Sequence, residues 1–111
     1  MNYTNLIATY RQLADVTGQA LGATQTRDWQ RYAALQEDED ALLQALKTYG
    51  PLPQDRAIMI MVTEWIYRIL ADQQQTASLI STWQTDILQE INSTVSSKRL
   101  TDTYQTPVKG G

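Results

Sequence analysis

The chain has 111 residues, a length that suits one domain. With 42% hydrophobic and 19% charged residues, its composition is that of a folded domain and not of a disordered or membrane-spanning chain. It contains no Cys and no His, which excludes a disulfide framework, removes the commonest zinc ligands and argues against catalysis. A net charge of −3 argues against binding to nucleic-acid phosphates.

The chain shows no targeting or membrane segment. The first residues after Met1 have neither a basic flank nor an apolar signal core. The most apolar run, Ala57 to Ala71, is too short to span a bilayer and contains Glu64 and Arg68. We therefore expect a cytoplasmic protein.

The first predicted helix runs roughly from Tyr3 to Gln25. Its apolar and threonine residues recur at steps of three and four, as on one face of a helix. The run Thr26 to Asp28 breaks this pattern. Asp28 is a good N-cap for a second helix, because its carboxylate can accept from the free N–H groups of the next turn.

The second predicted helix runs from Trp29 to about Tyr49. Its apolar stripe contains Trp29, Tyr32, Leu35, Leu42, Leu43 and Leu46. Gly50 can take a left-handed cap at its end, and Pro51 and Pro53 prevent its continuation.

The third predicted helix starts near Asp55 and meets no breaker before Ser96 and Ser97. A helix of that length would be on the order of 65 Å long. Near-heptad spacing continues throughout it, as in antiparallel coiled-coil packing. The residues of this seam are Ile58, Val62, Trp65, Ile69, Gln73, Thr76, Ile80, Trp83, Ile87, Ile91 and Thr94.

These elements predict an all-α fold: an elongated antiparallel helical bundle of two shorter helices packed on one long C-terminal helix. We expect residues 1–105 to form a single domain and residues 106–111 to form a flexible C-terminal tail.

The N-terminal half of the third helix carries more apolar surface than its seam requires. Met59, Ile66, Leu70 and Ala77 form a second stripe about 80° from the seam, while Ile60 and Tyr67 lie on the back. A helix that is apolar nearly all round must be buried on several sides. We predict that these six residues contact a partner protein; the alternative is that Met59, Ile66 and Leu70 complete the bundle core.

The acidic run Glu37 to Asp40 divides on the helical projection. Glu37, Asp38 and Asp40 point to solvent, and no calcium-type spacing is present. Glu39 falls within the apolar stripe, so we predict a buried carboxylate paired with an Arg, Lys or Tyr side chain. The residues Trp29, Trp65 and Trp83 are predicted core anchors near the bundle edge.

Four motifs, in this order and spacing, resemble the FliT family of flagellar type III export chaperones over about residues 3 to 105. They are Asp28-Trp29, the run Ala41 to Leu46, the run Ile66 to Asp72, and a basic-Leu-x-x-x-Tyr ending at Leu100 and Tyr104. We regard Leu100 and Tyr104 as structural positions of this pattern.

The resemblance implies a cytoplasmic chaperone that binds the C-terminal segment of the filament cap protein (FliD), prevents its premature assembly and delivers it to the export ATPase apparatus. It also implies binding of the FlhDC transcription regulator by some members. The segment after Tyr104 is shorter than in better-known members. Two alternatives therefore stay open: a permanently open groove, or a homodimer whose two copies cover each other.

Two alternative hypotheses concern other classes of protein. The first is a general helical interaction adaptor or another type III secretion co-chaperone, which would use the same surface for a different partner. The second is an all-helical enzyme of the chorismate-mutase type. Such a site needs convergent cations, whereas Arg11, Arg27, Arg31 and Arg68 fall mostly off the stripes. We expect no enzyme, no cofactor and no metal site.

Overall fold

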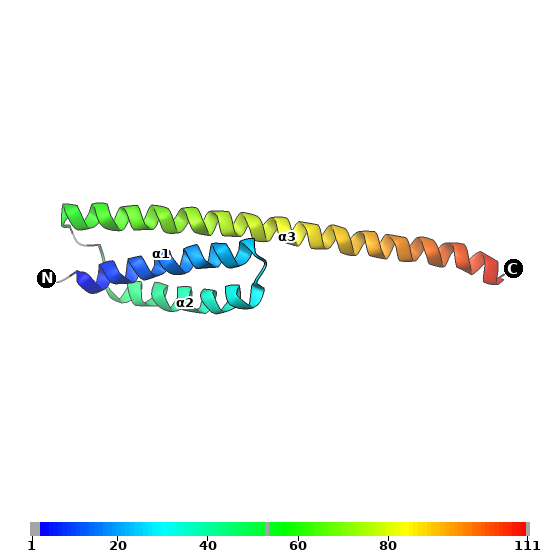
Figure 1. Cartoon of the computed structure of the whole chain (residues 1–111), viewed down its shortest axis with the longest axis horizontal. Helices are drawn as coiled ribbons and strands as arrows, with labels where there is room; N and C mark the ends of the chain where they lie inside the picture. The colour runs from blue at the N-terminus through cyan, green and yellow to red at the C-terminus, as the bar shows by residue number, and fades with distance from the viewer. Residues whose placement is uncertain (1–2, 53, 111) are drawn as a thin grey trace. The chain divides into compact units, whose positions relative to one another are not determined.

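The computed structural model describes residues 3–52 and 54–110, with side chains up to residue 95. The described part of the chain contains three α-helices and no strand: α1 (Thr4–Gln25), α2 (Trp29–Thr48) and α3 (Arg56–Gly110) (Figure 1). The predicted all-α fold, with two shorter helices packed on a long C-terminal one, is confirmed. The predicted ends agree within about two residues for α1 and α2.

The third helix continues beyond the predicted end near residue 97 and reaches Gly110. Ser96 and Ser97 do not end it, because serine lowers helix propensity without removing a backbone hydrogen bond. The side chains of Leu100 and Tyr104 lie outside the described residues. The single domain and the flexible tail stay predictions.

The chain divides into two compact units, Met1–Leu79 and Ile80–Gly111. The first unit contains α1, α2 and the N-terminal part of α3, and α2 runs antiparallel to both neighbours (Figure 1). The second unit is the remainder of α3. Ile80, Trp83 and Ile87 are half-buried there, whereas Ile91 is 52% exposed. The apolar spacing of the seam therefore continues into the second unit, but its residue Ile91 is exposed to solvent.

The core of the first unit has two clusters. One joins Leu13 and Ala14 of α1 to Ile69 of α3, and half-buried side chains of all three helices pack on it: Tyr10, Leu42, Leu46 and Trp65. The other joins Ala20, Ala23 and Leu35, with Val16 and Tyr32 around it. Burial of Val62, Ile69 and Thr76 shows that the predicted seam of α3 faces this core.

The connections are set by local chemistry. The carboxylate of Asp28 caps α2 by accepting a hydrogen bond from the Arg31 backbone N–H at 3.2 Å. Gly50 has a φ of 76°, the left-handed conformation that favours glycine after a helix end. Asp55 accepts from the Ile58 N–H at 3.1 Å and so caps the first turn of α3.

Candidate partner-binding groove

The six residues predicted to bind a partner lie on α3 within the first unit. Four of them are largely exposed: Met59 (42%), Ile60 (52%), Tyr67 (70%) and Leu70 (54%). Ala77 is also exposed, whereas Ile66 is half-buried. Neither α1 nor α2 encloses this set, which we call the α3 face.

Two contacts of α3 orient the α3 face within the first unit. Gln73 donates a hydrogen bond to Glu39 of α2. Asp72 lies instead beside Gly18 of α1, because a Cβ atom added to Gly18 would be 3.6 Å from an Asp72 carboxylate oxygen. Leu70 precedes Gln73 by three residues and Ala77 follows it by four, so both lie on the Gln73 side of the helix. The near edge of the α3 face therefore borders α2.

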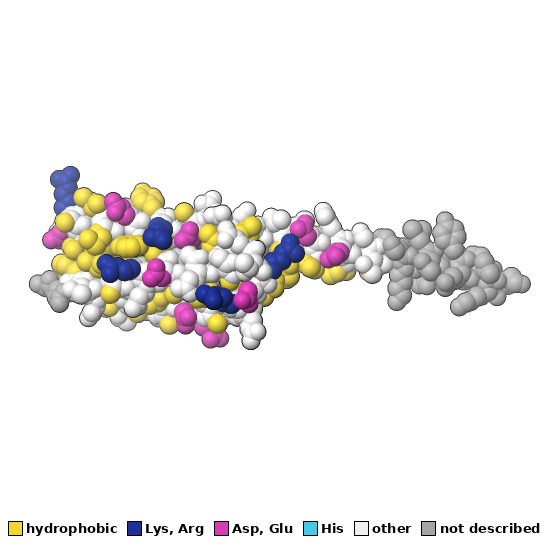
Figure 2. All heavy atoms as spheres, viewed as in Figure 1, with side chains coloured by type: hydrophobic (Ala, Val, Ile, Leu, Met, Phe, Trp, Pro, Cys, Tyr) yellow, Lys and Arg dark blue, Asp and Glu magenta, His cyan; other side chains and the backbone are white. Residues whose placement is uncertain are grey.

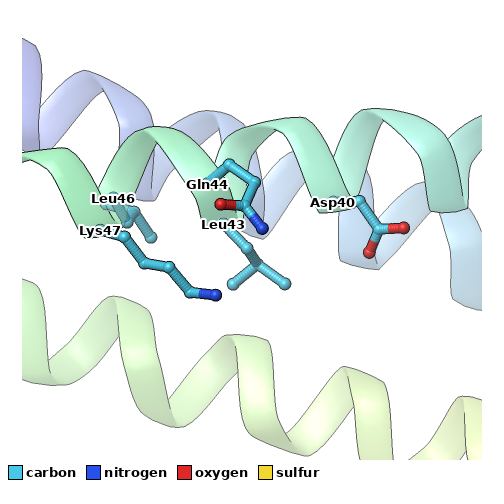
Figure 3. Close-up of a pocket in the computed structure, with 5 residues that line it drawn as sticks. All are labelled: Asp40, Leu43, Gln44, Leu46 and Lys47. Atoms are coloured by element: carbon cyan, nitrogen blue, oxygen red, sulfur yellow. The ribbon is translucent and has the colours of Figure 1, made fainter.

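A hollow of about 650 Å³ lies along α2, and its lining residues are Asp40, Leu43, Gln44, Leu46 and Lys47. Figure 3 shows Leu43 and Lys47 projecting into the space between the α2 ribbon and the neighbouring stretch of α3. Leu43 is 38% exposed, although the sequence placed it in the core stripe. We call the surface formed by this hollow and the near edge of the α3 face the α2/α3 groove.

A second hollow of about 400 Å³ lies on the outer edge of the α3 face. Met59, Ile60, Thr63 and Tyr67 line it, together with Gln54, Arg56 and Glu64 at its margins. Apolar side chains thus reach the surface along several turns of α3. In Figure 2, hydrophobic side chains of the first unit reach the surface with single charged side chains between them.

The α2 residues of the groove were missed by sequence reasoning. Leu43 adjoins Leu42 and Leu46, which pack on the core, and its own place at the edge depends on how α2 is rotated against α3. Helical periodicity alone does not fix that rotation, because a stripe of three leucines can turn either flank toward a neighbour. The sequence also contained little indication that Lys47 and Asp40 line the groove, since each has the pattern of an ordinary solvated charge.

The buried carboxylate of Glu39 corrects one prediction. Glu39 is 6% exposed, but its hydrogen-bond donors are amides and not the predicted Arg, Lys or Tyr. Gln36 Nε2 donates to one carboxylate oxygen at 2.9 Å, and Gln73 Nε2 donates to the other at 2.5 Å. Neutral amides satisfy both oxygens without bringing a second charge into the core. This network joins α2 to α3 beside the groove.

The other predicted residues are distributed through both units. Glu37, Asp38 and Asp40 are exposed. Trp29 is half-buried and meets Tyr32 edge to face with ring centroids 6.0 Å apart. Trp65 is half-buried under the Arg68 guanidinium, 5.8 Å from the ring centroid. Trp83 is half-buried in the second unit, outside the groove.

Two tyrosines of the core have raised pKa values. Burial raises the pKa of Tyr10. Burial also raises the pKa of Tyr32, and the negative charge of Glu39 raises it further. Both hydroxyls are therefore protonated at neutral pH, and neither lies in the groove.

Among the described residues, no group of three or more His, Cys, Asp or Glu side chains is arranged to hold a metal ion. Over the same part of the chain, no helix has both the length and the hydropathy that crossing a bilayer requires.

An all-α bundle with an open apolar groove beside a long helix is typical of proteins that bind helical segments of other proteins. The chain belongs to the FliT family: the family described as "Flagellar protein FliT" matches residues 7–106. This is a family of flagellar export chaperones, which confirms the resemblance seen in the sequence. No curated protein matches the chain. No solved structure matches it either.

Proposed function

We propose that this chain is a cytoplasmic export chaperone that binds the C-terminal segment of the flagellar filament cap protein, FliD, in the α2/α3 groove. Binding would prevent premature assembly of the cap protein and allow its delivery to the export apparatus. The observation that carries the proposal is the exposure of Leu43 on α2 and Leu70 on α3, at 38% and 54%, in a chain that belongs to this chaperone family.

The physics of the groove suits a helical ligand. Met59, Ile66 and Leu70 recur at steps of seven and four along α3, so an apolar stripe of similar spacing on a second helix can pack against them. Leu43 extends the apolar wall onto α2. Met59 has a flexible thioether side chain that repacks easily around a bound segment.

Affinity is expected to be moderate. Ordering a flexible segment into a helix costs several kcal/mol of the gross contact energy. Moderate affinity favours release, which a carrier needs when it hands over its cargo. Two further steps belong to the same proposal. The chaperone with bound cargo would be delivered to the export ATPase, and the chaperone without cargo would bind the FlhDC regulator.

The direct experiment is a pull-down of the purified chain with full-length cap protein and with cap protein lacking its C-terminal segment. We expect capture of the full-length protein and loss of capture after truncation. Capture of neither form would refute the proposal. Equal capture of both would show that the chaperone recognises another part of the cap protein.

A further inference from the structure

We propose that the α2/α3 groove fixes the direction of the helix that docks in it, an inference that rests on the proposed function. The docked segment lies with its C-terminal end against Lys47 and with its N-terminal end toward Asp40. It therefore runs parallel to α2 and antiparallel to α3. The ligand that the groove fits is an amphipathic helix whose C-terminal end is negatively charged.

The charges of the groove are unequally placed along its length. Lys47 lies in the last turn of α2 and lines the hollow, whereas Asp40 lies two turns earlier on the same wall (Figure 3). Seven residues of helix separate the two charges by about 10 Å along the axis. Because α2 and α3 are antiparallel, the end of α2 and the start of α3 meet at the same end of the unit, and Lys47 marks that end of the groove (Figure 1).

A docked helix is itself polar along its axis. Its last carbonyl groups carry about half a negative charge, and its first N–H groups carry about half a positive charge. A segment that ends at a chain terminus adds a full carboxylate at the negative end. Placing that end beside Lys47, and the positive end beside Asp40, gives attraction at both ends; the opposite direction gives repulsion at both.

The remaining charges near the groove do not reverse this arrangement. The Asp55 carboxylate caps the first turn of α3 through the Ile58 N–H, so its negative charge is offset by the positive end of α3. Glu64 lines the outer hollow of the α3 face, which lies on the side away from α2. Lys47 also lies beside the negative C-terminal end of α2, so its positive charge reduces the repulsion between that end and the negative end of the docked helix.

The direction can be measured because the chain has no cysteine, so one introduced cysteine gives a unique site for a nitroxide label. Gln54→Cys places the label near the start of α3, and Gln74→Cys places it toward the far end of the α3 face; both positions are exposed. The probe is the isotopically labelled C-terminal segment of the cap protein. We expect the label at position 54 to broaden the signals of the probe's last residues and the label at position 74 to broaden those of its first residues.

The reverse pattern, or equal broadening of both ends by each label, would overturn the direction while leaving the chaperone proposal intact. Absence of binding in the unlabelled chain would overturn the proposed function itself, so the two failures are distinguishable.

A charge-reversal experiment tests the cause of the direction. We expect Lys47→Glu to weaken binding of a probe with a free C-terminal carboxylate about three- to fivefold, and binding of a C-terminally amidated probe by less. Arg11→Glu changes the net charge equally on an exposed site outside the groove and serves as the matched control. An equal loss in both variants would show that net charge alone, and not the placement of Lys47, governs binding.

Discussion

At the scale of single residues, the Glu39 network is the most specific polar feature of the first unit. A carboxylate at 6% exposure accepts one hydrogen bond on each oxygen, from Gln36 of its own helix and from Gln73 of α3. Because an unsatisfied buried carboxylate oxygen is costly, this arrangement selects one rotation of α2 against α3. That rotation is also what turns Leu43 toward the groove.

We predict that Gln73→Leu lowers the free energy of unfolding by about 1–3 kcal/mol, because one carboxylate oxygen loses its donor. The exposed Gln75→Leu on the same helix is the matched control and should change it by less than about 0.5 kcal/mol. Glu39→Leu combined with Gln73→Leu should cost less than the sum of the two single changes, since no charge is then left buried. Urea denaturation measures the free energy of unfolding of the variants Gln73→Leu, Gln75→Leu, Glu39→Leu and the double variant. Strict additivity would show that the Glu39 and Gln73 side chains do not interact.

Tyr32 makes the stability of the folded protein depend on pH in the alkaline range. Its pKa in the folded protein is raised above the usual value of about 10, first by burial and then by the charge of Glu39. A raised folded-state pKa means that the contribution to stability is fully present below pH about 10 and is lost as pH rises through the folded value.

Glu39→Gln removes the second of these causes. We therefore predict that this variant lowers the pKa of Tyr32 in a spectrophotometric tyrosine titration while leaving the pKa of Tyr10 raised, because the latter is raised by burial. An unchanged titration curve would show that the charge of Glu39 does not reach Tyr32.

At the scale of the elements, α3 combines a buried and an open side within the first unit. Val62 and Ile69 are buried in the core, whereas Ile60, Tyr67 and Leu70 are each more than half exposed. Two helices packed along one side of α3 leave the opposite side uncovered. The exposed apolar side chains therefore follow from the sequence of α3 and the packing of its neighbours together.

We predict that Leu43→Asp with Leu70→Asp abolishes capture of the cap protein while far-ultraviolet circular dichroism stays nearly unchanged. Both side chains are exposed, so a carboxylate there stays solvated and the core is untouched. Leu88→Asp with Ile91→Asp, at 60% and 52% exposure in the second unit, is the matched control and should retain capture. Loss of capture in the control alone would move the binding site to the second unit.

The elements were largely predictable because their signals are local. The cap at Asp28, the left-handed Gly50 and the three-four spacing each act within a turn or two of chain, so α1, α2 and the start of α3 followed from the sequence. The partners of Glu39 and the exposure of Leu43 depend on contacts between helices. Those contacts are set by how the helices rotate against one another, and periodicity leaves that rotation open.

At the scale of the whole molecule, the family gives the class of protein, and the α2/α3 groove is the proposed binding site. The match over residues 7–106 identifies a flagellar export chaperone family. The first unit supplies an apolar groove with the cation Lys47 at one end and the anion Asp40 along the same wall. A carrier of this kind needs a surface that is open before its cargo arrives and apolar enough to hold it.

Docking of the cap protein's C-terminal segment in the α2/α3 groove can be observed by methyl-resolved NMR of the chain during titration with that segment, because Leu43, Met59, Ile66 and Leu70 all carry methyl groups. We expect the largest shift changes on these methyls and little change on those of Ile87, Leu88 and Ile91. Saturating binding with the largest changes at Ile87, Leu88 and Ile91 would contradict docking in this groove.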